Sequence, residues 1–191
     1  MAKEREMWKK GNKKASYYQK YLEDSQKNPL GQTGSGEMKK IIRPEEMPWE
    51  NSRHGRIKHM MNQKMAEKMN IPAKSVDLYM QEIPPRGRSG KHRHMSEECV
   101  YIIEGKGYDM HWNVDIELED EYKWTISDKG EKYEWEAGDV VYIPINTIHQ
   151  HFNSDPDKPA RIISAVNRVY SHLGYGYNDL EQLEDAPEYK K

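Results

Sequence analysis

Four of the eight histidines stand in two pairs, each with a single residue between its members. The pairs are His92 with His94, and His149 with His151. Residues i and i+2 of a β-strand point to the same face, about 6.6–6.8 Å apart along the strand, so each pair can direct two imidazoles into one cavity. Because imidazole is a common ligand of divalent metals, this spacing predicts a metal site.

Glu98 follows His94 by four residues. A straight strand would place it about 13 Å further along, too far to share a metal whose bonds to its ligands are about 2 Å long. We therefore expect the chain to bend at residues 95–97 and to fold Glu98 back beneath His94. His149 is expected to approach from the other side of the same cavity.

The elements that must position these side chains lie between Val76 and Tyr170. Short runs of Val, Ile and Tyr alternate there with Gly, Pro, Asn and Asp. This pattern predicts an all-β domain, an antiparallel sandwich or barrel. Cys99 follows Glu98, so strand alternation turns it away from the metal, and we expect it to be buried in a structural role.

Residues 1–75 are expected to form an N-terminal extension, and residues 171–191 a C-terminal tail whose acidic part, 178–191, is loosely held. The extension begins with helical spacing over residues 3–24 and continues through a Gly-rich linker at 28–36. This first segment is expected to be an arm that packs on the body or on another subunit. Met60, Met61, Met65 and Met69 then suggest one packing face of a helix. The arm and the Met-rich face together predict a homodimer.

Composition excludes several classes of protein. The net charge is -2 and the pI is about 6.5, without the basic stripe expected of a nucleic-acid-binding protein. No window approaches the roughly 18 apolar residues that cross a bilayer, and no apolar signal segment follows the start. Cytoplasmic location is the default expectation, and a single cysteine agrees with it.

Two sets of residues carry a resemblance to a known family. The first set has the pattern G-x4-H-x-H-x3-E-x6-G and consists of Gly87, His92, His94, Glu98 and Gly105. The second has the pattern G-x5-P-x-N-x2-H-x3-N and consists of Gly138, Pro144, Asn146, His149 and Asn153. Their order and spacing resemble the two motifs of the cupin superfamily, with one residue fewer in the first gap and Asn146 where the family usually has Gly. Asn tolerates left-handed backbone, so the turn can be kept.

The resemblance covers about residues 76–170 and implies a small cupin-type antiparallel β-barrel (jelly roll) that binds a metal inside. The residues that match the family's metal ligands are His92, His94, Glu98 and His149. The stretch between the motifs, 105–138, is long enough for an extra hairpin lined by His111, Trp112 and Trp124, which is expected to roof the pocket.

Further side chains are candidates for the site. His151 is expected to act as an acid or base or to hydrogen-bond a ligand, with a surface position at the strand's rim as the alternative. Arg86 and Arg88 are expected either to clamp a substrate carboxylate or to be solvated loop charges. Tyr79, Gln81 and Trp112 are expected to be substrate-binding walls or core residues.

Three imidazoles and one carboxylate leave positions open on an octahedral ion, which favours catalysis over a structural role. The run KHRHMSEECVYIIEGKG resembles gentisate 1,2-dioxygenase-like cupins. This predicts an Fe(II) dioxygenase that acts on a hydroxylated, aromatic carboxylic acid. The alternatives are a non-redox isomerase, lyase or decarboxylase that uses Mn, Ni or Zn, and a non-catalytic cupin that binds small molecules.

Overall fold

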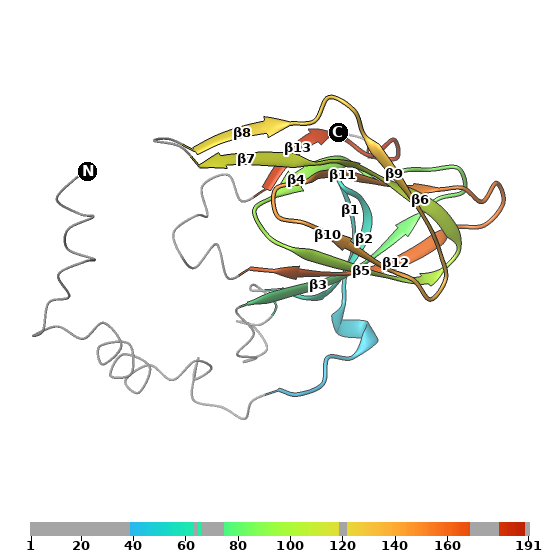
Figure 1. Ribbon diagram of the computed structural model, residues 1–191. Coiled ribbons are helices and arrows are strands. Elements are labelled where there is room, and N and C mark those ends of the chain that lie inside the picture. Colours follow the sequence, from blue (N-terminus) through green and yellow to red (C-terminus); the bar gives the residue numbers. More distant parts are fainter. Residues whose placement is uncertain (1–38, 63–64, 66–74, 119–121, 169–179, 190–191) are drawn as a thin grey trace, which may run out of the picture.

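The computed structural model describes residues 39–62, 65, 75–118, 122–168 and 180–189. Nearly all regular structure in these ranges is β-strand, arranged as two facing sheets (Figure 1). Every strand pair in the described ranges is antiparallel, which confirms the predicted all-β barrel. In chain order the elements are η1 (Pro44–Glu46), β1 (Trp49–Ser52), β2 (Gly55–Met61), β3 (Val76–Ile83), β4 (Lys91–His94), β5 (Glu98–Glu104), β6 (Lys106–Trp112), β7 (Val114–Leu118), β8 (Tyr122–Ile126), β9 (Glu131–Glu136), β10 (Val140–Ile143), β11 (Ile148–Asn153), β12 (Ala160–Asn167) and β13 (Leu180–Glu184).

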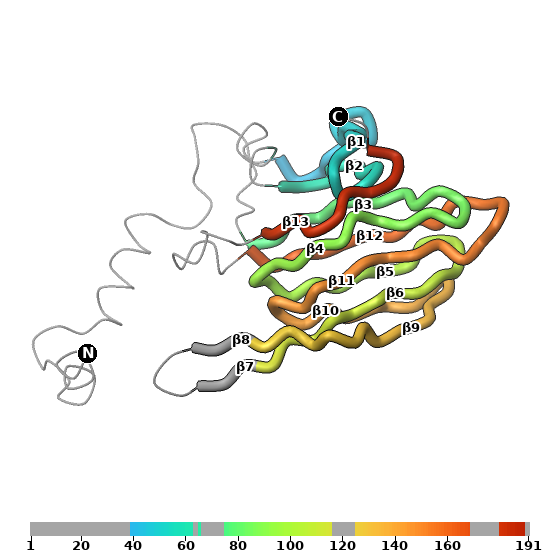
Figure 2. Tube along the Cα trace, turned by 90° about the horizontal axis from the view of Figure 1, so that it is seen from above, coloured from blue at the N-terminus to red at the C-terminus, as the bar shows by residue number. Residues whose placement is uncertain are grey.

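One sheet has six strands in the order β1-β2-β3-β12-β5-β10, and the other has five in the order β13-β4-β11-β6-β9. Apart from β1, β2 and β3, which follow one another in the chain, neighbours in the two sheets are not consecutive in sequence, and Figure 2 shows these strands lying side by side along the barrel. The β7–β8 pair forms a separate hairpin that projects beyond one end of the sheets (Figures 1 and 2).

Inward and outward residues alternate along the strands, as the period of two requires. Burial alternates without interruption along β12, where Ala160, Ile162, Ser164 and Val166 are buried. The apolar core fills one part of the barrel. Its buried members are Ile83, Val100, Ile102, Trp135, Ile143, Ala160 and Ile162.

The sheets extend beyond the predicted 76–170 boundaries. Met60 and Met61 lie in strand β2 and not in the helix that their spacing suggested. β2 pairs with β3, with Met61 opposite Leu78, and β1 pairs with β2. A short helix is marginal alone, whereas a strand beside β3 gains a full ladder of backbone hydrogen bonds, so tertiary pairing decides the conformation.

The acidic tail also contributes a strand. β13 pairs with β4, with Gln182 opposite His92, so this part of the tail is held and not loose. Cys99 is exposed, contrary to its expected burial. It does point away from Glu98, but the outer face of β5 is accessible to solvent. The domain boundaries at 75/76 and 170/171 stay predictions.

Several expectations fall outside the described residues, namely the helix at 3–24, the linker at 28–36 and Met69 of the Met-rich run. The homodimer and the cytoplasmic location stay predictions as well. Within the ranges that the structure describes, no helix is long and apolar enough to cross a membrane.

Candidate metal centre

Strand register brings the candidate ligands together. His92 of β4 lies directly opposite His149 of β11, so both rings stand on the inner face of the five-stranded sheet. Their ring centroids are 4.2 Å apart, and the His94 ring lies 5.1 Å from that of His149. Glu98 opens β5 of the facing sheet. One ligand atom from each of the four buried residues lies within 4.8 Å of all the others.

The expected bend at residues 95–97 is confirmed. The chain leaves β4 after His94 and enters β5 at Glu98, and the two side chains meet with His94 Nε2 2.8 Å from Glu98 Oε2. Asn146 fixes this corner, because its backbone N–H donates to the His94 carbonyl at 2.7 Å. Asn146 has φ of 59°, the left-handed backbone expected where the family pattern has glycine. His149 comes from the strand next to β4, not from across the barrel.

The hydrogen bonds of two imidazoles fit metal ligation. His94 Nδ1 donates to the Ser96 carbonyl at 2.7 Å, and His149 Nδ1 donates to the Thr147 carbonyl at 3.0 Å. In the neutral rings these bonds leave the Nε2 lone pairs directed at the centre. Two lone-pair atoms, His94 Nε2 and Glu98 Oε2, then face each other at 2.8 Å and require a cation or a proton between them. The donor set therefore fits a bound divalent metal.

The electrostatics of the cluster agree with that assignment. Burial opposes ionisation of Glu98, but contacts with His149 and His94 outweigh it and hold the pKa of its carboxyl well below the ordinary value. Burial, helped by neighbouring imidazoles, lowers the pKa of His92 well below its usual range, and burial also lowers the pKa of His149. An ionised carboxylate and neutral imidazoles are the protonation states that ligate metals.

Tyr79 supports the carboxylate from the six-stranded sheet. Its hydroxyl donates to Glu98 Oε1 at 3.1 Å, while Glu98 Oε2 faces the histidines. Burial first, and then the Glu98 charge, raise the pKa of Tyr79 well above its ordinary value. The phenol therefore stays a neutral donor that orients Glu98, as partners of ligating carboxylates commonly do.

A second buried group lies beside the four-residue cluster. His151 is fully buried, and its ring centroid is 5.5 Å from that of His149. Its Nδ1 donates to Asp109 Oδ1 at 2.9 Å, and Trp135 Nε1 donates to the same oxygen at 2.8 Å. Burial lowers the pKa of His151, but the Asp109 carboxylate outweighs it, so the net shift is upward. Of the two alternatives for His151, the surface position is therefore wrong.

His54 enters the barrel from the turn between β1 and β2. Its ring centroid lies 4.3 Å from that of His92 at 77°, an edge-to-face contact, and 6.2 Å from that of His151. Burial lowers the pKa of His54 to about 3, so its ring is neutral. Neither ring nitrogen has a hydrogen-bond partner among the described residues.

A cavity of about 890 Å³ leads to this group from the side of β1, β2 and β13. His54, Tyr79, His92 and His94 line it. Its arginines are ion-paired, Arg53 with Asp185 at 2.5 Å and Arg168 with Asp77 at 2.8 Å. With this volume the cavity can hold a small organic molecule, and a molecule bound there would reach the candidate metal ligands His92 and His94.

Some predicted site residues lie elsewhere. Arg86 is exposed in the turn after β3, and Arg88 pairs with Glu184 at 2.8 Å, and neither lines the cavity. Trp112 is only partly buried and packs under Lys91, whose Nζ is 3.7 Å from the ring centroid. Gln81 is fully buried and donates to the His54 carbonyl at 2.8 Å, so it supports the site without lining the cavity.

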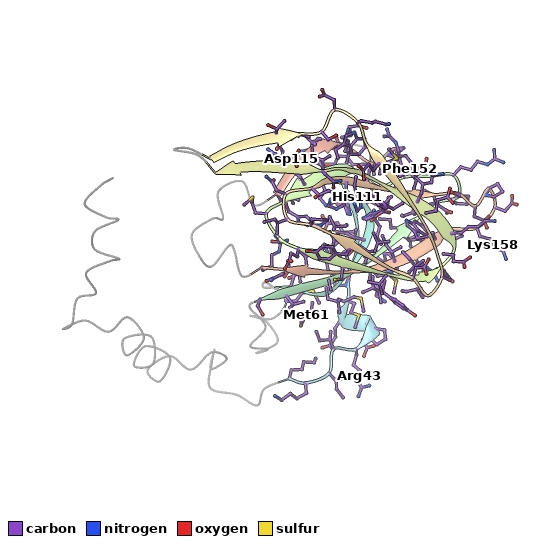
Figure 3. All side chains as sticks on the ribbon, in the orientation of Figure 1. Arg43, Met61, His111, Asp115, Phe152 and Lys158 are labelled. Atoms are coloured by element: carbon purple, nitrogen blue, oxygen red, sulfur yellow. The ribbon has the colours of Figure 1, made fainter. Side chains whose placement is uncertain are left out.

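The hairpin between the motifs does not roof this cavity. No described side chain of β7 or β8 is among its lining residues. Figure 3 shows Asp115 on the projecting hairpin and His111 between the sheets. The hairpin continues strands β6 and β9, which lie on the opposite edge of the five-stranded sheet from β13. Nothing is described of the Trp124 side chain.

Sequence reasoning missed His54 and Asp109 as residues of the site. His54 lies outside the strand-rich segment, and only its neighbour Gly55 signalled a turn there. Asp109 and His111 are two residues apart on β6 and therefore point to the same face of the sheet. β6 pairs with β11, which places His151 opposite Asp109. Knowledge of that register would have identified them, and a single sequence does not supply it.

Comparison with known proteins supports the architecture. Residues 79–166 match the family model described as a cupin domain. The polyketide cyclase RemF from Streptomyces resistomycificus is similar at a TM-score of 0.50 and 16% identity, over 81% of this chain and 88% of that one. Vicilin from hazelnut, Corylus avellana, is similar at 0.50 and 16%, over 67% of this chain and 33% of vicilin. The chain thus spans about one third of that vicilin, and at these identities the likeness shows the fold.

Proposed function

With residues 79–166 forming a cupin domain, we propose that the protein is a metal-dependent enzyme acting on a small hydroxylated carboxylic acid. His92, His94, Glu98 and His149 would hold one divalent metal ion. The observation that carries the proposal is the convergence of the ligand atoms of four buried residues within 4.8 Å, at the end of an open cavity.

The charge of the site favours an anionic substrate. A divalent ion with one glutamate and three neutral imidazoles leaves one net positive charge, and the His151–Asp109 pair adds none when both are ionised. The cavity's arginines are neutralised by their partners. A carboxylate would therefore be attracted to the centre itself, where low dielectric strengthens the attraction.

We place Fe(II)-dependent dioxygenase chemistry first among the reactions. Four protein ligands leave up to two positions of an octahedral ion, and a bound iron(II) would supply electrons and open coordination for dioxygen. The protein's own residues bind and orient the acid and exclude water from the buried cluster. His151 does not line the cavity, and in this proposal its Nε2, which has no hydrogen-bond partner in the described part of the chain, bonds a substrate that reaches past His54 and His92, while Asp109 orients the ring.

A non-redox reaction with Mn, Ni or Zn is the second candidate. The observation that favours it is Glu98, because gentisate 1,2-dioxygenase-like cupins tend to rely on three histidines, and here the carboxylate lies within the cluster. A metal in that setting would act as a Lewis acid on the substrate's oxygen atoms.

The test is elemental analysis of protein purified without chelator, followed by oxygen uptake with a panel of dihydroxybenzoates. Iron near one equivalent with substrate-dependent oxygen consumption is the expected result. Zinc, manganese or nickel without oxygen consumption would replace the dioxygenase by the non-redox enzyme. Protein without metal, whose melting temperature no divalent ion changes, would contradict the proposal and favour a non-catalytic binding protein.

A further inference from the structure

His54 carries polar atoms that the fold itself does not use. Both ring nitrogens are buried and lack a partner within the described ranges. A buried polar atom without a hydrogen bond is destabilising, because it has lost its bonds to water and gained none in the protein. Such a group is usually retained for a functional reason, since a phenylalanine would fill a similar volume without that cost.

The backbone of His54 is held on both sides. Its N–H donates to Ser52 Oγ at 3.2 Å, and its carbonyl accepts from the Gly90 N–H at 2.9 Å and from Gln81 Nε2 at 2.8 Å. The next residue, Gly55, has φ of 126°, which only glycine adopts without strain, and an added Cβ would meet Gln81 Nε2 at 2.8 Å. The turn is therefore built to fix where the imidazole stands.

The position of His54 is beside the metal cluster and not within it. The ring contacts His92 edge to face, yet His54 is absent from the group whose ligand atoms lie within 4.8 Å of one another. It lines the same cavity as His92 and His94. A ligand bound at the cluster through this cavity would thus have His54 at its side.

We infer that His54 is a substrate-binding residue that hydrogen-bonds an oxygen of a hydroxylated carboxylic acid held at the metal. The inference rests on the proposed function and adds the residue that selects for the hydroxyl group. A neutral imidazole has one N–H donor and one lone-pair acceptor. A hydroxyl group also has one donor and acceptor lone pairs, so the two groups are complementary.

The experiment uses full-length protein loaded with Co²⁺, whose visible absorption changes when a ligand binds. The probes are 2-hydroxybenzoate and benzoate, which differ only by the hydroxyl group. In the wild-type protein the hydroxylated acid is expected to bind more tightly. In His54→Phe this preference should fall roughly tenfold, the effect of one hydrogen bond to a buried partner, while Co²⁺ stoichiometry and benzoate affinity stay unchanged.

Two further variants sharpen the result. His59→Phe changes another histidine of the same cavity, one whose Nε2 is paired with Glu50 at 2.6 Å, and should leave the preference intact. His54→Gln keeps a donor and an acceptor and should restore part of the preference, even where the phenylalanine variant folds poorly.

Several results would overturn the inference. They are an unchanged preference in His54→Phe, equal loss for both acids, and no binding of either acid to the Co²⁺-loaded wild type at millimolar concentration. Failure of the wild-type protein to bind Co²⁺ would instead reject the metal site itself, so the two failures are distinguishable.

Discussion

The two ends of the barrel interior differ in chemistry although the same strands build both. Along β5, the inward residues Ile102 and Val100 belong to the apolar core, and the next inward residue is Glu98. Along β3, Ile83 of the core is followed inward by Gln81 and then Tyr79. Each strand thus changes from apolar to polar within about two inward positions.

The two ends of the barrel interior also differ in how many buried polar atoms lack a hydrogen bond. In the apolar core of the described residues, the one side-chain polar atom, Trp135 Nε1, donates to Asp109, whereas buried side-chain nitrogen and oxygen atoms without a hydrogen bond gather at the polar end. At the polar end they belong to His54, Gln81, His92, Asp109, His111, His149, His151 and Ser164, and one further such atom belongs to Glu188. The apolar end therefore supplies folding energy by itself, and the polar end gains its full stability only with a cation or polar ligand.

The largest expected effect on stability is at the apolar end. Ile162→Ala removes a fully buried side chain and should lower the free energy of unfolding by about 2–5 kcal/mol, measured by urea denaturation. Ile163→Ala, on the outer face of the same strand, is the matched control and should cost clearly less. If both variants lost the same free energy of unfolding, burial in the apolar core would not be what makes Ile162 important.

A bound divalent ion should raise the stability of the protein through its contacts at the polar end. Adding a divalent ion at about one hundred times its Kd to metal-free protein should raise the free energy of unfolding by about 2.7 kcal/mol. The gain should disappear in His94→Ala, which is expected to keep its β-structure by circular dichroism but to lose bound metal. A variant that binds stoichiometric metal would place the ion elsewhere.

Only part of the candidate site and of the fold could be predicted from the sequence alone. The proximity of His92, His94 and Glu98 was predictable because they lie close in sequence, where strand period and one turn nearly determine their relation. The place of His149 in the candidate set followed from the resemblance to the cupin motifs. His54 and the Asp109–Trp135 contact depend on strands that meet only in the folded sheet. Met60 and Met61 mislead for the same reason, because pairing with β3 outweighs their helical spacing.

Asp109 provides a smaller, pH-dependent effect. Its contacts with His151, His111 and Trp135 outweigh burial and lower the pKa of its carboxyl, so the ionised form stabilises the fold. This contribution is present above the unfolded-state value of about 3.9 and is lost as the pH falls through the folded-state value. Asp109→Asn should therefore cost about 1–3 kcal/mol at pH about 6, and the difference from wild type should shrink below pH about 4.

The measurement is urea unfolding of metal-free protein across this pH range. Asp115→Asn, at an exposed position on β7, is the control and should be neutral. A cost at Asp109 that does not change with pH would show that its charge is not what stabilises the polar end.

The smallest effects are expected at the arginines that sequence reasoning placed in the site. Arg86→Ala and Arg88→Ala should each change the free energy of unfolding by less than about 0.5 kcal/mol, because one is exposed and the other forms a surface ion pair. Binding of 2-hydroxybenzoate to the Co²⁺-loaded protein should also be unchanged. A weakened affinity in either variant would return that arginine to the site.

The most direct test of the metal centre is a crystal structure of the metal-loaded protein with anomalous diffraction recorded at the absorption edge of the bound ion. We expect one anomalous peak per chain, from an ion bonded to His92, His94, Glu98 and His149. An ion bonded to other residues, or protein that carries its metal with Glu98 turned away from it, would contradict this metal centre.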